Sequence, residues 1–217
     1  MVNSEAKTPR ERYRAQVQAE IKERAWEQIA TAGASALSLN AIAKQMGMSG
    51  PALYRYFAGR DELITELVRD AYRSLADTFA ATVRTGSDVT ALAHALRTWA
   101  LDDPHRYFLV YGTPVPGYHA PDDITAIARE IMAPLLDACA RLPEDRPATP
   151  FDEHLEKHRD WAEGHPAPAA VLHRALTFWT RLHGALSLEL AGHFTGLGFD
   201  PARFFAAELH ELTGSPE

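Results

Sequence analysis

Cysteine is almost missing from this sequence. Its 217 residues include only one, Cys139. A single cysteine excludes an internal disulfide framework and fits a reducing cytosol. Because Cys139 lies in an apolar segment with helical periodicity, we expect a buried and unreactive thiol.

Long uncharged apolar runs are also absent, and the first residues are charged and polar. A membrane-spanning helix needs about 20 mostly apolar residues in succession, and a secretory signal needs an apolar core of its own. We therefore expect neither a signal peptide nor a membrane span, and we predict a cytoplasmic protein.

The sequence carries no signature that demands catalysis. A Gly-x-Ser-x-Gly elbow, a phosphate-binding glycine loop and the HExxH pattern of zinc proteases are all missing. We therefore expect no enzymatic activity and no metal or cofactor.

Two histidines keep one enzymatic alternative open. His154 and His158 are one helical turn apart, and two imidazoles at that spacing can share a zinc ion. Charged residues flank both, so a solvent-exposed helix face is the preferred interpretation. A helical metal-dependent enzyme that uses this pair is the alternative from another class of protein.

No segment alternates as a β-strand does, and helical periodicity runs through almost the whole chain. We therefore predict an all-α fold with a three-helix helix-turn-helix head in residues 1–60. A larger helical regulatory and dimerisation domain is predicted for residues 61–217. Its later helices are expected at about 121–141, 150–163, 166–193 and 201–213.

The net charge of −7 hides an asymmetry along the chain. Residues 1–60 hold nine Lys and Arg against five Asp and Glu, which gives +4. Residues 61–217 hold thirteen against twenty-four, which gives −11. A basic first part and an acidic remainder suggest that one end of the protein faces nucleic acid. A chance fluctuation in charge is the alternative.

A tight turn between two short helices lies within SLNAIAKQMGMSGPALYRYFAGRDEL, residues 38–63. Ser38 and Ser49 occupy positions expected for helix caps. Gly47 can adopt the left-handed conformation that turns the chain sharply between them. The pattern predicts a helix-turn-helix, whose last helix enters the major groove of DNA. The alternative is a plain helical hairpin with aromatic residues on its surface.

The third helix of this head has small residues where it would approach the bases. Gly50 and Ala52 permit a close approach of the backbone, and Pro51 and Ala52 can contact thymine methyl groups. Leu53 and Phe57, four residues apart, are expected to fix the helix to the core of the head.

Longer side chains follow on the same predicted helix and can reach the DNA backbone. Tyr54, Arg55 and Tyr56 have hydrogen-bond donors that suit phosphate oxygens. Ser38 and Arg60 begin neighbouring helices, whose first amides favour phosphate binding. The predicted DNA-binding residues are therefore Ser38, Ser49, Gly50, Pro51, Ala52, Tyr54, Arg55, Tyr56 and Arg60.

Three arginines precede the head, at Arg10, Arg12 and Arg14. They are able to add phosphate contacts. A solvated start of the first helix is the preferred interpretation of this charge cluster.

The segment LSLNAIAKQMGMSGPALYRYFAGRDELI resembles the DNA-binding head of the TetR family of transcriptional regulators. The shared features include Ile42-Ala43, Gly47, Ser49, Leu53-Tyr54 and Tyr56-Phe57. The resemblance implies DNA contacts by Ser38 and Ser49, by Tyr54 to Tyr56, and by Arg60.

This sequence departs from the family pattern at the start of the third helix. Members of the family often have Lys and Gly where this chain has Gly50 and Pro51, and a small hydroxyl residue at position 52. Few side chains are left there to form hydrogen bonds with bases. We expect sequence readout to depend on methyl contacts, Arg55 and DNA shape.

The expected helix at 166–193 has two adjacent apolar stripes and therefore needs two neighbours. A second subunit is the economical choice, because two paired heads bind two half-sites of DNA. We predict a homodimer, and a monomeric core helix is the alternative. The two stripes are Leu172, Leu176, Trp179, His183, Leu186 and Leu190, and Val171, Ala175, Phe178, Leu182 and Ala185.

The segments FWTRLHGALSLEL and PHRYFLVYGTPVPGYHAP resemble a C-terminal domain of some TetR-type regulators, which carries a Trp and a His-Gly pair. The resemblance implies a domain that receives a small-molecule effector. Ordinary core packing is the alternative for each aromatic residue. The predicted ligand-binding residues are Phe79, Trp99, Tyr107, Phe108, Tyr111, Trp179 and His183.

These patterns together predict a homodimeric, TetR-type repressor that binds a palindromic operator in double-stranded DNA. Its effector would release the DNA by binding preferentially to the non-binding state. A constitutive DNA-binding regulator without an effector is the alternative within the same class.

Overall fold

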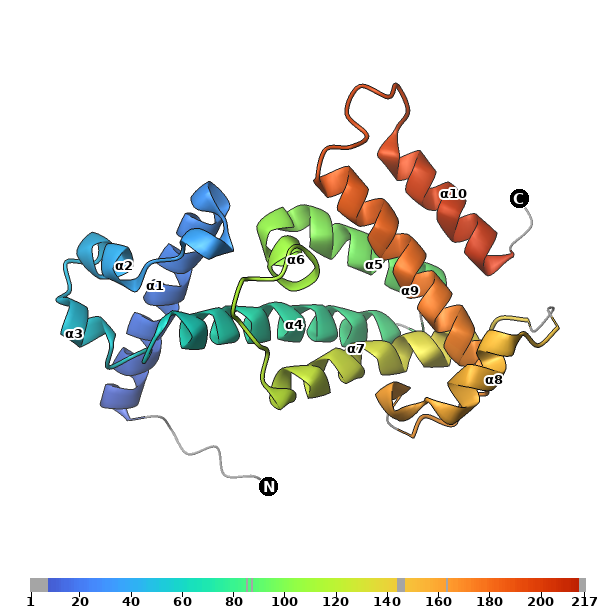
Figure 1. Ribbon diagram of the computed structural model, residues 1–217, viewed down its shortest axis with the longest axis horizontal. Coiled ribbons are helices and arrows are strands. Elements are labelled where there is room, and N and C mark those ends of the chain that lie inside the picture. Colours follow the sequence, from blue (N-terminus) through green and yellow to red (C-terminus); the bar gives the residue numbers. More distant parts are fainter. Residues whose placement is uncertain (1–7, 85, 87, 144–146, 163, 215–217) are drawn as a thin grey trace. The chain divides into compact units, whose positions relative to one another are not determined.

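The structure is a computed structural model that describes residues 8–84, 86, 88–143, 147–162 and 164–214. These residues form ten α-helices and two short 3-10 helices, with no β-strand among them (Figure 1). The predicted all-α fold is confirmed. None of the described helices combines the length and the apolar character needed to cross a membrane.

The helix bounds agree with the prediction for the helices expected at about 121–141 and 201–213. In chain order they are α1 (Pro9–Ala32), η1 (Ala34–Ala36), α2 (Leu39–Gln45), α3 (Gly50–Leu53), α4 (Arg60–Arg84), α5 (Val89–Asp102), α6 (Pro104–Tyr111), α7 (Asp122–Ala140), α8 (Pro150–Lys157), η2 (Asp160–Ala162), α9 (Ala169–Leu190) and α10 (Pro201–Thr213).

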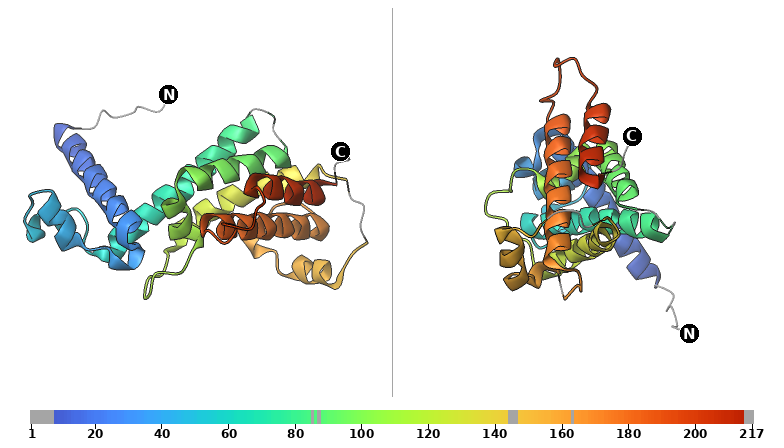
Figure 2. Two further views of the ribbon diagram at one scale, coloured as in Figure 1. Left: turned by 90° about the horizontal axis from the view of Figure 1, so that it is seen from above. Right: turned by 90° about the vertical axis from the view of Figure 1, so that its right-hand side faces the viewer.

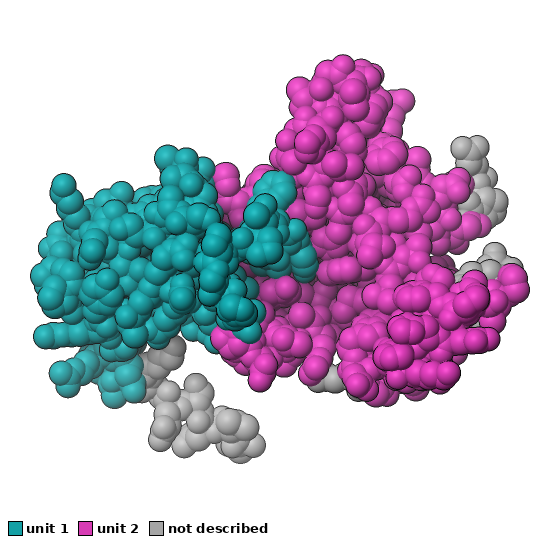
Figure 3. Space-filling view, viewed as in Figure 1, with its two compact units in different colours: residues 1–70, 108–120 teal, residues 71–107, 121–217 magenta. Residues whose placement is uncertain are grey.

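The helices group into two compact units (Figure 3). Unit 1 comprises residues 1–70 and 108–120, and unit 2 comprises residues 71–107 and 121–217. Helix α4 therefore begins in unit 1 and ends in unit 2. Each unit has a buried apolar core of its own.

Unit 1 is built on α1, which begins at a capping box. The Thr8 hydroxyl accepts a hydrogen bond from the Glu11 amide, and the Glu11 carboxylate accepts one from the Thr8 amide. Every fourth residue of the middle of α1 is buried, so this face carries the core of the unit. The core residues are Val17, Ile21, Ala25, Ile29, Leu37, Leu39, Ile42, Ala43, Leu53, Phe57, Leu63, Ile64, Leu67, Val68 and Val115.

The turn between α2 and α3 is the sharpest feature of unit 1. Ser38 caps α2 by accepting a hydrogen bond from the Ala41 amide at 3.3 Å. Gly47 has φ of 64°, which confirms the predicted left-handed turn. Ser49 is the N-cap residue of α3, but its side chain forms no capping hydrogen bond. The predicted role of the Ser49 hydroxyl as a cap is therefore wrong.

Three predicted bounds also need correction. The helix predicted at 150–163 is split into α8 and η2, because His158 leaves the helical conformation with φ of −132°. The helix predicted at 166–193 covers only Ala169–Leu190, and Pro168 precedes it in an extended conformation. Helix α3 ends at Leu53, so Tyr54 to Tyr56 lie in a turn and not on the third helix.

Unit 2 is a bundle in which α9 packs against α7, α8 and α10 (Figure 2). Polar side chains of α9 join it to its neighbours. Arg174 donates hydrogen bonds to the carbonyl oxygens of Cys139, Leu142 and Pro143 at 3.0, 3.1 and 2.7 Å. These carbonyls lie at and just beyond the C-terminus of α7, where a positive charge is favourable.

Cys139 is fully buried in α7, as predicted. Burial raises the pKa of its thiol to about 12, so the thiol stays protonated and a poor nucleophile.

The conformation of Gly47 generates a stability prediction. The substitution Gly47→Ala forces an L-residue into the left-handed region and is expected to lower the free energy of unfolding by about 1 kcal/mol. Urea denaturation of the full chain measures the change. Gly59→Ala is the matched control, because neither glycine has a neighbour within 4 Å and φ of Gly59 lies outside the left-handed region. Equal effects of the two substitutions would contradict the prediction.

Candidate nucleic-acid interface

Helix α3 is only four residues long, and it is fixed to unit 1 from one side. Leu53 is fully buried, and Phe57, just beyond the helix, is 2% exposed. Ser49 and Pro51 are exposed, whereas Gly50 and Ala52 are half-buried. The outward face of the helix therefore consists of small side chains, as the sequence predicted.

The packing of the head does not require glycine at position 50. A Cβ at this position would meet only the Asn40 amide oxygen, at an ordinary contact distance of 3.6 Å. Its backbone is helical, so no left-handed conformation requires glycine either. The absence of a side chain leaves the outer surface of α3 open to close approach by another molecule.

The turn after α3 presents three longer side chains. The Tyr56 amide donates to the Leu53 carbonyl at 2.8 Å, which tightens the chain as α3 ends. Tyr54 is 47% exposed and Arg55 is exposed, whereas Tyr56 is half-buried. A turn directs these side chains differently from a helix, but it keeps Tyr54 and Arg55 accessible.

Arg14 of α1 holds this turn, a role that the sequence analysis missed. Its Nη2 donates a hydrogen bond to the carbonyl oxygen of Arg55 at 3.0 Å. Its guanidinium carbon lies 5.4 Å from the centroid of the Tyr56 ring, a cation–π distance. The partners are 41 residues apart in the chain, so no local spacing signals the contact.

Two further predicted DNA-binding residues begin helices of unit 1. The Ser38 backbone amide donates to Gln28 Oε1 at 3.0 Å, and its hydroxyl oxygen caps α2. The Arg60 Nη2 donates to the carbonyl oxygen of Ala34 at 3.0 Å, so its guanidinium is partly occupied within the head. Both residues retain N–H or O–H donors that these bonds do not use.

In unit 2 the structure brings together part of the predicted ligand-binding set. Phe79, Trp99 and Tyr107 are all buried. The Tyr107 hydroxyl lies 3.0 Å from His183 Nδ1, 3.2 Å from the His183 carbonyl oxygen and 2.8 Å from Ser187 Oγ. The Trp179 ring centroid is 4.2 Å from that of His183. Phe108 and Tyr111, in contrast, belong to unit 1.

Burial shifts the pKa values of the central pair in this cluster. It lowers the pKa of His183 to about 3, because the imidazolium form is poorly solvated there. It raises the pKa of Tyr107, and the hydrogen bond with Ser187 offsets part of that rise. At neutral pH the pair is therefore a phenol hydrogen-bonded to a neutral imidazole.

Arg106 extends this aromatic cluster and was also missed from the sequence. Its guanidinium carbon lies 4.5 Å from the centroid of the Trp99 ring, and its Nη2 donates to the Trp99 carbonyl oxygen at 2.8 Å. The Trp99 indole N–H donates to Ser74 Oγ at 3.1 Å. The contacts join the successive helices α5 and α6 to Ser74 of α4, which lies 25 residues before Trp99.

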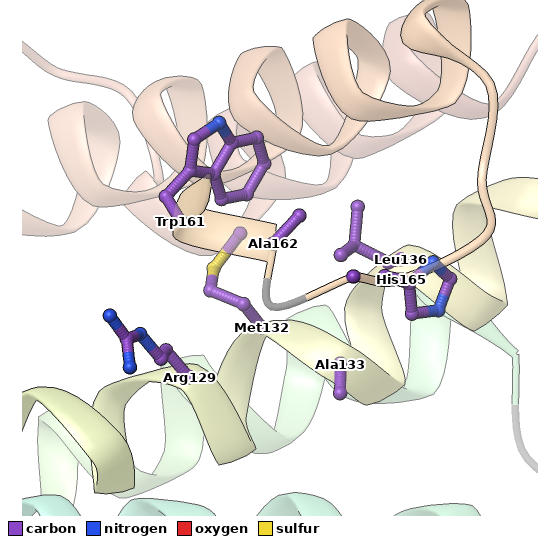
Figure 4. A pocket seen from close by; sticks show the side chains of 8 residues that line it. Arg129, Met132, Ala133, Leu136, Trp161, Ala162 and His165 are labelled. Atoms are coloured by element: carbon purple, nitrogen blue, oxygen red, sulfur yellow. The ribbon is translucent and has the colours of Figure 1, made fainter. Parts of the chain in front are cut away.

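A pocket of about 200 Å³ lies in unit 2 beside η2 (Figure 4). Its His165 Nε2 lies 3.1 Å from Asp137 Oδ1, and its Nδ1 accepts a hydrogen bond from the Ala167 amide. None of the predicted ligand-binding residues lines it. The lining residues are Arg129, Met132, Ala133, Leu136, Trp161, Ala162, Gly164 and His165.

The two histidines of the enzymatic alternative stack on each other. The ring centroids of His154 and His158 are 4.1 Å apart, and His158 Nδ1 lies 2.9 Å from the carbonyl oxygen of His154. In the part of the chain that the structure describes, no three His, Cys, Asp or Glu side chains gather as a metal site would require.

Comparison with known proteins places both parts of the chain in one family. Residues 21–67 match the model of the bacterial regulatory proteins of the tetR family. Residues 89–212 match the tetracyclin repressor-like C-terminal domain. The chain belongs to the TetR family of DNA-binding transcriptional regulators, which confirms the resemblance seen in the sequence.

Individual relatives agree with this assignment. The HTH-type transcriptional regulator Rv1816 of Mycobacterium tuberculosis is 39% identical over 215 residues, which cover 92% of each chain. The crystal structure of regulatory protein SCO4313 has 70% identity and a TM-score of 0.89, and the match covers 96% of this chain and 100% of that one.

A more distant structure shares the fold alone. The fatty acid degradation regulator FadR of Bacillus halodurans has 15% identity and a TM-score of 0.55. The match covers 92% of this chain and 99% of that one.

The depressed pKa of His183 generates a prediction about stability and pH. An unfolded histidine titrates near 6.5, so below about that pH the unfolded chain binds a proton that the folded chain does not. Stability is therefore lost as pH falls from about 6.5 towards 3. Between about pH 7 and pH 5, His183 is expected to lower the free energy of unfolding by about 2 kcal/mol.

Urea denaturation at several pH values compares the wild type with His183→Gln, in which this contribution is removed. The stability of the variant should fall less steeply below about pH 6.5. His105→Gln is the matched control, because His105 is an exposed histidine of α6 in the same unit. Parallel pH dependences for wild type and His183→Gln would contradict the prediction.

Proposed function

We propose that this TetR-family protein is a transcriptional repressor that binds a near-palindromic operator as a homodimer and is released by a small-molecule effector. The observation that carries the DNA part is the outward surface of α3 and its following turn. It combines an open backbone at Gly50 with exposed Tyr54 and Arg55. A regulator of this kind acts in the cytoplasm, where bacterial DNA lies.

The side chains of this surface suit two kinds of contact. Pro51 and Ala52 offer apolar contacts to thymine methyl groups, whereas Tyr54 and Arg55 offer donors to phosphates. Ser49 adds a hydroxyl that no cap occupies. Because few of these groups discriminate bases by hydrogen bonds, the proposal assigns much of the specificity to DNA shape and to the spacing of two heads.

Apolar exposure on α9, α10 and the segment between them supports a homodimer. The stripe of α9 with Val171, Ala175 and Phe178 is buried, whereas Leu176 and Trp179 on the adjacent stripe are only half-buried. A patch of this kind on a folded unit is typical of a surface that another subunit covers. The most exposed apolar side chains in this region are Leu188, Leu197, Phe199 and Phe204.

The buried aromatic cluster of unit 2 supports an effector domain. Trp99, Tyr107 and His183 place polar atoms inside an apolar core, an arrangement that can give a ligand orientation and specificity. One observation favours the alternative of a constitutive regulator: the Tyr107 hydroxyl already has partners in His183 and Ser187. An effector would have to bind the two states of the dimer with different affinities to release DNA.

Selection of tight-binding duplexes from a random pool tests the proposal. The wild type should enrich a two-fold symmetric motif, and binding should weaken steeply as salt rises because phosphate contacts release counterions. Arg55→Ala should weaken binding by roughly tenfold or more, the loss expected for a charge-assisted hydrogen bond to phosphate. Tyr54→Phe tests the hydroxyl group while it keeps the ring.

The matched control is Arg84→Ala, which removes an equal charge from an exposed arginine in the last turn of α4, outside the proposed DNA-binding and dimer surfaces. It should leave operator affinity unchanged. An enriched duplex then serves as the probe for a screen of small molecules that release DNA. Absence of an enriched motif would contradict operator binding, and absence of any releasing compound would favour the constitutive alternative.

A further inference from the structure

We infer that a surface beside α3, which shares Arg55 with the DNA-binding surface proposed above, takes the sugar–phosphate backbone of the operator. This surface is a groove of about 610 Å³ between the start of α1 and the turn after α3, and we call it the Arg10–Arg55 groove. The inference rests on the operator binding proposed above. The groove is lined by Thr8, Arg10, Glu11, Tyr13, Arg14, Arg55 and Tyr56.

The charge of the groove favours an anion. Three guanidinium groups, of Arg10, Arg14 and Arg55, face one carboxylate, that of Glu11. The Glu11 carboxylate accepts hydrogen bonds from the Thr8 amide at 2.7 Å and from the Thr8 hydroxyl at 3.0 Å. Among the described residues none of the three arginines forms an ion pair, so the lining of the groove has an excess of positive charge.

Arg14 joins the two walls of the groove. Its hydrogen bond to the Arg55 carbonyl oxygen and its position over the Tyr56 ring connect α1 to the turn after α3. A guanidinium group has five N–H donors, and the bond to Arg55 uses one. Arg14 therefore acts as a positioning residue for Arg55 and retains donors for an anion.

The donors of the groove suit a phosphodiester better than a small apolar ligand. Guanidinium groups match the geometry of two phosphate oxygens, and tyrosine hydroxyls add single hydrogen bonds. Tyr13, on the α1 wall, is 64% exposed and so remains accessible. The groove also continues the turn that carries Arg55, so a DNA strand contacted there can extend along the start of α1.

The chain provides a matched control for the charge argument. Arg12 is exposed and does not line the groove. At 3.6 residues per turn it is displaced by roughly 200° around α1 from Arg10. Arg10 and Arg12 therefore carry the same charge two residues apart on one helix, but on different sides of it.

The test measures the affinity of the full-length protein for its selected duplex over a range of salt concentrations. Arg10→Gln should reduce the slope of log affinity against log salt by about two units, one for each subunit of the dimer, and it should weaken binding to operator and random duplexes alike. Arg12→Gln should retain the slope and the affinity of the wild type. Circular dichroism verifies that each variant of these exposed residues is folded.

Arg14 has a separate readout, because it acts through the position of Arg55. Arg14→Lys keeps the charge but cannot both donate to Arg55 and cover the Tyr56 ring with a planar group. It should weaken binding to the selected duplex roughly tenfold, and Arg55→Ala should cost less affinity in the Arg14→Lys background than in the wild type, because both changes remove the same phosphate contact. Equal costs of Arg55→Ala in the two backgrounds would contradict the positioning role.

A duplex with single neutral methylphosphonate linkages locates the contact. One linkage outside the symmetric motif should weaken the wild type, and Arg10→Gln should be insensitive to the same change. If Arg10→Gln and Arg12→Gln behave alike, the groove inference is wrong while operator binding stands. If the wild type selects no duplex at all, both the proposed function and this inference are overturned.

Discussion

The burial of Leu53 and Phe57 is the interaction on which the position of α3 and the following turn depends. A four-residue helix such as α3 has no stability of its own, because helix nucleation is costly and few hydrogen bonds repay it. The two side chains are almost completely buried and fix α3 and the following turn to the core of unit 1. Gly47, in the left-handed conformation, turns the chain from the end of α2 towards α3. The outward residues of α3 therefore do not hold the helix in place. Their small side chains leave the surface of α3 open.

Unit 2 stabilises its helices differently, with polar groups inside an apolar bundle. Arg174 satisfies carbonyl groups at the end of α7, and Asp152, which is buried, lies 2.9 Å from His173 Nδ1. Tyr107 and His183 satisfy each other in the same way. A buried polar group without a partner costs free energy, so each pair favours one arrangement of the helices. A ligand that competes for such a partner would therefore act on helix packing.

Much of the fold followed from local sequence signals. Helical periodicity predicted the bounds of α7 and α10 to within one residue, and Ser38 and Gly47 predicted the start of α2 and the turn that follows it. The bounds of α3 and α8 were less predictable, because tertiary contacts outweigh propensity in short helices. Helix α9 begins later than predicted because Pro168 is extended. The division at residue 60 and the roles of the DNA-binding and ligand-binding residues remain predictions. The contact of Arg14 with Arg55 could not have been found, because the two residues are 41 positions apart. Arg106 contacts Trp99 only seven residues away, but across the break between α5 and α6, where helical spacing predicts no contact.

The central claim is that two copies of α3 read two half-sites on one face of a DNA duplex. Hydroxyl-radical footprinting of the selected duplex measures this most directly, because it reports which sugars the protein covers. The account predicts two protected clusters related by two-fold symmetry, with their centres about one helical turn of roughly 10 base pairs, or a multiple of it, apart. One continuous cluster without symmetry, or no protection at concentrations that saturate binding, would contradict it.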